Sequence, residues 1–168
     1  MNQIQNLSHQ ELLKLIEVYA KNWLAHDGCW FLVAEEKYGM DLAIELDRKS
    51  WERFAVAEAR RIMKVFNIES NGGLKALEKA FKYRLYSAIN SQKVEWINEK
   101  TMIFKMVECR VQKTRRKKNL PDFPCKSVGI IEFEQFAKTI DSRIKTSCIS
   151  CPPDPVGEFY CCWKFTLD

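Results

Sequence analysis

The first half of the chain carries apolar residues at helical spacing. Ser8-His-Gln-Glu11 is a capping-box pattern, in which the Ser8 hydroxyl accepts the backbone N–H of Glu11 and the Glu11 carboxylate accepts that of Ser8. Apolar residues then recur every three or four positions, and an Asp-Gly pair at 27–28 is a typical helix stop. The pattern predicts a helix over about residues 9–26 and a short buried helix over 29–38.

Two further helices are expected over about residues 41–66 and 74–89, separated by the turn signal Asn71-Gly72-Gly73. Glu58 interrupts the apolar face of the longer helix. A charge on such a face needs a partner or a wet pocket, because burial without either is costly. The first half is therefore expected to be helical throughout.

The pattern changes to strand-like alternation near residue 93. It predicts strands over about 94–97 and 101–113, a helix over 126–139, and two last strands over 143–149 and 158–167. Prolines at 152, 153 and 155 cannot donate to a strand ladder, so this link is expected outside the sheet interior. The order predicts an α+β fold, in which a helical N-terminal half (about 8–91) packs on a small antiparallel sheet formed by two hairpins with an intervening helix (about 92–168), as a single domain.

Length and composition support this expectation. The chain has 168 residues, of which 46% are hydrophobic. The longest strictly apolar run, residues 29–34, is far shorter than the roughly 20 residues of a membrane helix. The N-terminus lacks the basic segment and apolar stretch of a signal peptide. We therefore expect a cytoplasmic protein that does not enter a membrane, and the sequence leaves a homodimer open.

The net charge of +5 comes from one segment. Residues 105–118 hold seven Lys and Arg side chains against Glu108. A solvated strand end or loop is favoured over an anion-binding patch, so nucleic acid is not an expected partner.

Cysteine content is the strongest anomaly. Six of the seven cysteines fall in the second half, and an odd count without a signal peptide argues against a disulfide framework. Cys148-Ile-Ser-Cys151 has the spacing that lets two thiolates bind one metal ion. The predicted ligand set for zinc or an iron–sulfur cluster is Cys109, Cys125, Cys148, Cys151 and Cys161.

Two alternatives remain open for these cysteines. They could be buried, unliganded thiols, or a catalytic or redox thiol could be among them. Cys162 is expected on the sheet face opposite Cys161, because neighbouring strand residues alternate. Neither Cys29 nor Cys162 is given a role.

The second group of candidates surrounds His26-Asp27. His26 is expected in the last turn of the first helix, where it could act as a general base, a metal ligand or a helix-capping residue. Asp27 or Glu35 would orient it. In a cavity between helices and sheet, the candidate ligand-binding residues are Trp30, Glu58 and Arg110.

Three stretches carry a family resemblance: residues 23–31 (WLAHDGCWF), 109–125 (CRVQKTRRKKNLPDFPC) and 148–163 (CISCPPDPVGEFYCCW). They resemble a family of prokaryotic cytosolic proteins of unknown function, over most of the chain. The resemblance marks these family-motif positions: His26, Asp27, Trp30, Cys109, Cys125, Cys148, Cys151 and Cys161.

More distantly, the helix from residue 126 and the closing hairpin are similar to the end of the 4-vinyl reductase domain and of 2-amino-thiazoline-4-carboxylate hydrolase. The first similarity implies a small hydrophobic ligand and cysteines that hold a metal. The second implies hydrolytic opening of a thiazoline ring.

Two functions are therefore expected as alternatives. The first is a small-ligand-binding protein with a cysteine-ligated zinc or iron–sulfur site. The second is a hydrolase acting on a small cyclic or sulfur-containing compound, with His26 as base. In that enzyme, Cys109 could serve as nucleophile if Arg110 or His26 lowered its pKa.

Overall fold

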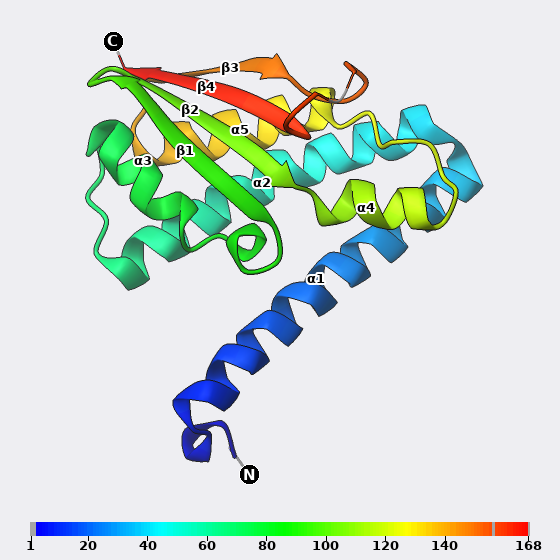
Figure 1. Cartoon of the computed structure of the whole chain (residues 1–168), viewed down its shortest axis with the longest axis horizontal. Coiled ribbons are helices and arrows are strands. Elements are labelled where there is room, and N and C mark those ends of the chain that lie inside the picture. Colours follow the sequence, from blue (N-terminus) through cyan, green and yellow to red (C-terminus); the bar gives the residue numbers. More distant parts are fainter. Residues whose placement is uncertain (1–2, 156, 168) are drawn as a thin grey trace.

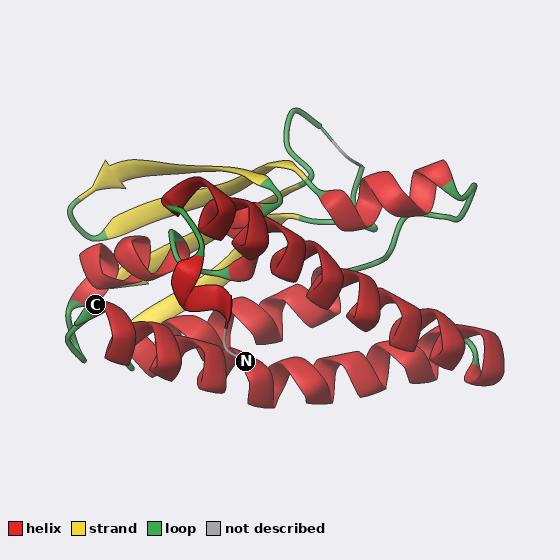
Figure 2. Ribbon diagram, turned by 90° about the horizontal axis from the view of Figure 1, so that it is seen from below, coloured by secondary structure: helices red, strands yellow, loops and turns green. Residues whose placement is uncertain are grey.

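The computed structural model describes residues 3–155 and 157–167. The elements in chain order are η1 (Gln3–Asn6), α1 (His9–Tyr38), α2 (Met40–Phe66), α3 (Gly73–Phe81), η2 (Leu85–Ala88), β1 (Ser91–Asn98), β2 (Thr101–Glu108), α4 (Arg110–Lys117), α5 (Lys126–Ile140), β3 (Ile144–Ser150) and β4 (Cys161–Leu167). The predicted α+β class is confirmed (Figures 1 and 2).

The four strands form one antiparallel sheet in the order β1-β2-β4-β3. A tight turn joins β1 to β2, whereas the proline-containing link that follows β3 lies outside the sheet, as predicted. Helix α5 packs against β3, and α2 packs along α5, so α5 is the layer between the sheet and the long helices (Figure 1).

Aromatic side chains fill the space between α5 and the sheet. Phe104 of β2 pairs with Trp163 of β4, and both are almost completely buried. The Phe133 ring lies 4.9 Å from the Trp163 ring, measured between centroids. Gly129 makes this approach feasible, because a Cβ atom there would lie 2.7 Å from Cζ2 of Trp163. Full burial of each large side chain contributes about 2 to 3 kcal/mol.

Helix α1 corrects the first boundary that the sequence predicts. Its capping box forms as expected, with Glu11 N donating to Ser8 Oγ at 3.3 Å and Ser8 N donating to Glu11 Oε2 at 2.9 Å. However, the helix continues through Asp27 and Gly28 and ends at Gly39, whose φ is 81°. The stop signal at 27–28 is overridden because the residues beyond it pack against the body of the protein. Residues 29–38 therefore belong to α1 and do not form a separate helix. Most of their side chains are not buried.

The second correction concerns the strand expected to reach residue 113. Strand β2 ends at Glu108, and α4 begins at once, with the Arg110 backbone N–H donating to Asn90 Oδ1 at 2.9 Å. Helical geometry places Gln112 and Arg115 on one face, three residues apart, and both are buried. Tertiary hydrogen bonds therefore decide the conformation of this polar segment, and the basic run is not simply a solvated strand end or loop.

The helix predicted over 74–89 is also shorter than expected. It ends at Phe81, and a 3₁₀ turn at Leu85–Ala88 follows. This break turns Arg84 into the protein interior, where it is 3% exposed.

The first half of α1 extends away from the body (Figure 1). Leu13, Ile16 and Tyr19 are exposed along it. Within the described ranges, no helix combines the length and the apolar character that crossing a membrane requires. A homodimer stays a prediction.

Candidate functional site

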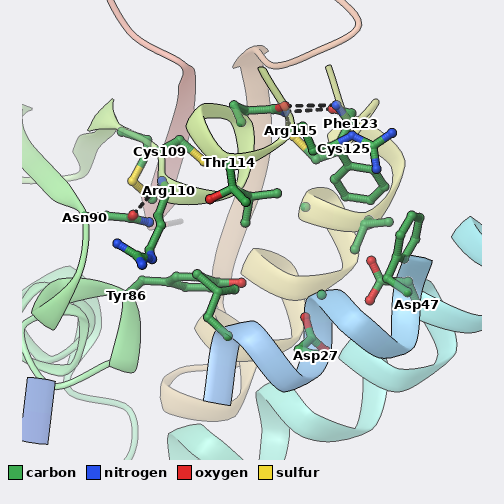
Figure 3. Close-up of a pocket in the computed structure, with 18 of the residues that line it drawn as sticks. Asp27, Asp47, Tyr86, Asn90, Cys109, Arg110, Thr114, Arg115, Phe123 and Cys125 are labelled. Carbon is green, nitrogen blue, oxygen red and sulfur yellow. Dashed lines mark hydrogen bonds between the residues drawn. The ribbon is translucent and has the colours of Figure 1, made fainter. Parts of the chain in front are cut away.

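A cavity of about 320 Å³ lies where α1 and α2 meet α4, α5 and the sheet (Figure 3). Its volume falls at the lower end of the roughly 300 to 1,000 Å³ typical of small-molecule sites. Much of the wall is apolar and includes Leu24, Trp51, Met106, Phe123, Phe133 and Trp163. The polar part of the wall includes cysteine thiols, three carboxylates and four basic side chains: Lys21, Arg110, Arg115 and Lys118.

Four of the five predicted metal-ligating cysteines line the cavity: Cys109, Cys125, Cys151 and Cys161. They are the residue after β2, the residue before α5, the residue after β3 and the first residue of β4. Cys148 on β3 does not line it, and the exposed Cys29 of α1 does. Tertiary packing therefore gathers four predicted ligands that are up to 52 positions apart in the sequence.

The thiols of Cys125 and Cys151 are in contact, with their Sγ atoms 3.4 Å apart. One backbone hydrogen bond joins their two loops, and another hydrogen bond lies within the loop that carries Cys151. Lys126 N donates to Pro152 O at 2.9 Å, and Cys151 N donates to Asp154 Oδ2 at 3.3 Å.

The pKa values of these thiols differ, because their neighbours and their burial differ. The neighbouring Cys151 thiol lowers the pKa of Cys161, because it favours the Cys161 thiolate. The contact with Cys125 and then that with Cys161 raise the pKa of Cys151, because both favour its protonated thiol. Burial raises the pKa of Cys109 to about 12 and that of Cys148 to about 11. The arrangement thus favours Cys161 as the thiolate of the group.

The predicted metal centre is not evident in this arrangement. Within residues 3–155 and 157–167, no group of three or more His, Cys, Asp or Glu side chains is placed to hold a metal ion. The zinc or iron–sulfur site stays a prediction, for which the four cavity-lining cysteines are the available soft donors.

Three carboxylates form the acidic part of the cavity: Asp27 of α1, Asp47 of α2 and Glu132 of α5. Burial raises the pKa of Asp47 to about 7, and the charges of Asp27 and Glu132 act in the same direction. Burial also raises the pKa of Asp27, although the neighbouring His26 opposes this. In Figure 3, Asp27 and Asp47 lie on helices at one side of the pocket, and Cys109 and Cys125 lie at the opposite side. Perturbed carboxyl groups in a cleft are a common mark of a functional site.

Arg84 does not line the cavity, but it contacts two carboxylates, one of which is Glu132 of the acidic region. Its Nε donates to Glu58 Oε2 at 2.9 Å, and its Nη2 lies 2.7 Å from Glu132 Oε1. The guanidinium carbon is also 4.6 Å from the centroid of the Phe136 ring. The Glu58 carboxylate thus has a buried partner in Arg84, and Glu58 does not line the cavity.

The structure separates the remaining predicted site residues. Arg110 lines the cavity, whereas His26 and Trp30 are exposed and do not line it. Glu35 forms a bidentate contact with Arg115, at 2.9 and 3.1 Å, that ties the end of α1 to α4. His26 and Glu35 are therefore not brought together with the thiols in the cavity wall.

Asp47, Glu132 and Arg84 were missed by reasoning from the sequence. A signal existed for Glu132, which shares a helix face with Val128 and Phe136 and interrupts that apolar face. Asp47 lies four residues before the core residue Trp51, a weaker signal of the same kind. Nothing in the local pattern indicates that Arg84 is buried.

A comparison with curated proteins and a comparison with solved structures each returned no match. The similarity to the 4-vinyl reductase domain and to the thiazoline hydrolase therefore stays a prediction. A model described as a family of unknown function (DUF6125) matches residues 5–167. Because this match covers nearly the whole chain, the protein belongs to that family of unknown function.

Proposed function

We propose that the protein binds a small, mostly apolar molecule that carries a basic nitrogen. The observation that carries this proposal is the cavity of about 320 Å³, with its largely apolar wall and its acidic region at Asp27 and Asp47. The apolar part of the ligand would occupy the space beside Trp51, Phe133 and Trp163. Its ammonium group would lie against the carboxylates.

The raised pKa values support a cationic ligand. Burial and the nearby acidic groups disfavour ionisation of Asp47, whose pKa is about 7. An ammonium group would reverse this effect, because an opposite charge within a few ångströms favours the carboxylate. Binding should therefore release protons near neutral pH, and amine affinity should rise between pH 6 and 8 as Asp47 ionises.

Three matched compounds test the proposal: 2-phenylethylamine, 2-phenylethanol and 3-phenylpropionate. Trp51 and Trp163 line the cavity, so intrinsic tryptophan fluorescence reports binding. We expect the amine to bind at least about tenfold more tightly than the other two, which corresponds to about 1.4 kcal/mol. Asp47→Asn should remove most of that preference. Glu52→Gln, at an exposed site on the same helix, should not.

Two outcomes would contradict the proposal. Equal binding of the three compounds would refute the role of the carboxylates. No fluorescence response and no calorimetric heat with any of them would refute the cavity as a binding site for ligands of this class.

Hydrolysis and metal binding are not needed for this proposal. A hydrolase that uses His26 as base requires it to reach a substrate within hydrogen-bond distance. His26 is exposed and does not line the cavity, so ligand binding has better support.

A further inference from the structure

The sulfur-rich part of the cavity wall has a chemical property that ligand binding does not use. Cys151 is 2% exposed and is one of three thiols, with Cys125 and Cys161, in this part of the wall. Its Sγ is 3.4 Å from that of Cys125, and Cys161 lines the same cavity. Cys125 and Cys161 are only half-buried, and both line the cavity.

We propose that Cys125, Cys151 and Cys161 form a thiol–disulfide exchange site for small organic disulfides that enter the cavity. The inference rests on the proposed function only in that the cavity must admit a small molecule. The reagent oxidises the protein, so the product is an internal disulfide and two small thiols.

The first step assigns the attack to Cys161. Its sulfur attacks one sulfur of the bound disulfide, a Cys161–S bond forms and the S–S bond of the reagent breaks. The departing thiolate takes up the proton that Cys161 has lost. Trp163 favours this step, because its buried indole N–H has no hydrogen-bond partner among the described residues and is available to stabilise a thiolate on Cys161, two residues away on β4.

The second step assigns resolution to Cys151. Its sulfur attacks Cys161 Sγ and forms the Cys151–Cys161 disulfide. The second small thiolate leaves with the proton that Cys151 gives up. Two protein thiols are thereby oxidised, and one organic disulfide is reduced by two electrons to two thiols.

A third step can move the bond without further oxidation. Cys125 attacks Cys151 Sγ across the 3.4 Å contact, and its proton passes to Cys161. The Gln112 side chain fixes the Cys125 end of this contact. Its Nε2 is 3.6 Å from Cys125 Sγ and donates to Phe123 O at 2.8 Å. The structure therefore places Cys151 as the shared member of two alternative disulfides.

Two of the remaining cysteines, Cys29 and Cys162, provide controls. Cys29 is exposed on α1 and would keep a mixed disulfide, because none of the contacts above gives it a resolving partner. Cys162 is buried and does not line the cavity. A Cys29→Ser background removes the exposed thiol, and Cys162→Ser in that background serves as the matched control.

The experiment uses the full chain and one equivalent of 4,4′-dithiodipyridine, a neutral aromatic disulfide whose thiopyridone product is followed by absorbance. In the Cys29→Ser background we expect two thiopyridones per protein and no retained label. Peptide mapping should find Cys151 joined to Cys161 or Cys125. Cys162→Ser should leave rate and stoichiometry unchanged.

The variants separate the assigned roles. Cys151→Ser should release one thiopyridone and keep the label on Cys161, whereas Cys161→Ser should slow the first release at least tenfold. Circular dichroism checks that each variant is folded. A label retained in the Cys29→Ser background, or a Cys151→Ser variant that still releases two thiopyridones, would overturn the proposal.

Failure here is distinguishable from failure of the proposed function. Asp47→Asn should lose amine preference but keep the release of two thiopyridones. If the amine series shows no binding while exchange proceeds as described, the ligand class is wrong and the thiol site stands. If amines bind and the label is retained, the thiol site is wrong.

Discussion

Replacement of Arg84 by Met is the most informative test of how the acidic region is supported. Arg84 is 3% exposed and contacts Glu58 at 2.9 Å and Glu132 at 2.7 Å. Met preserves much of the apolar volume but leaves two buried carboxylates without their cation. Breaking a buried ion pair from one side costs about 3 to 5 kcal/mol. For a chain of this size, the melting temperature should fall by roughly 6 to 20 °C.

The loss should depend on pH. The pKa of Glu132 is already raised by burial, and Arg84 is the charge that opposes this rise. Without Arg84, the folded-state pKa rises further above the unfolded value. A raised carboxyl pKa means that stability is present at low pH and is lost as the pH rises through the folded value. The deficit of Arg84→Met should thus be smaller at pH 4.5 than at pH 7.5.

Urea unfolding followed by circular dichroism at both pH values measures this effect. Lys138→Met is the matched control on α5, because it breaks an exposed ion pair with Glu134 and should cost less than about 0.5 kcal/mol. Adding Glu132→Gln to Arg84→Met should recover part of the loss at pH 7.5. A loss below about 1 kcal/mol, or an equal loss at both pH values, would refute the reasoning.

Three other predictions concern stability and composition. The pKa of Asp141 is held at about 2, first by the Arg143 side chain, so its stabilisation is present above pH 4 and is lost as the pH falls toward 2. Asp141→Asn should therefore lower the free energy of unfolding by about 1 to 2 kcal/mol at pH 7, with little difference at pH 2, measured by urea unfolding. Gly129→Ala should cost about 1 to 3 kcal/mol in thermal unfolding, because its Cβ would lie 2.7 Å from Trp163; Gly28→Ala, with no atom within 4 Å, should not destabilise α1. If the cysteines hold a metal, protein purified without oxygen should contain close to one equivalent of zinc, or iron with inorganic sulfide, by elemental analysis; less than about a tenth of an equivalent, with thiols titratable in the folded state, would rule this out.

Local patterns were sufficient for most of the fold. The capping box at Ser8, the apolar spacing of α2 and α5 and the alternation along β2 each depend on residues within a few positions of one another. Local signals failed where distant contacts outweighed them. The Asp-Gly pair at 27–28 does not stop α1, and the segment after Cys109 becomes a helix because Gln112 and Arg115 find distant partners.

The sequence by itself determined the α+β class, the order of the four strands with a helix between the two hairpins, and the presence of chemically notable cysteines. Only the tertiary structure decided which side chains share a cavity. It gathers four of the five predicted metal ligands and adds Asp47 and Glu132, but leaves His26 and Trp30 at the surface. The physical reason is that helical and strand periodicity depends on residues close together in the sequence, and it indicates only which face of an element is buried. A site depends on the distances between elements that are far apart in the chain. Those distances are set by how α5 packs between the sheet and α2.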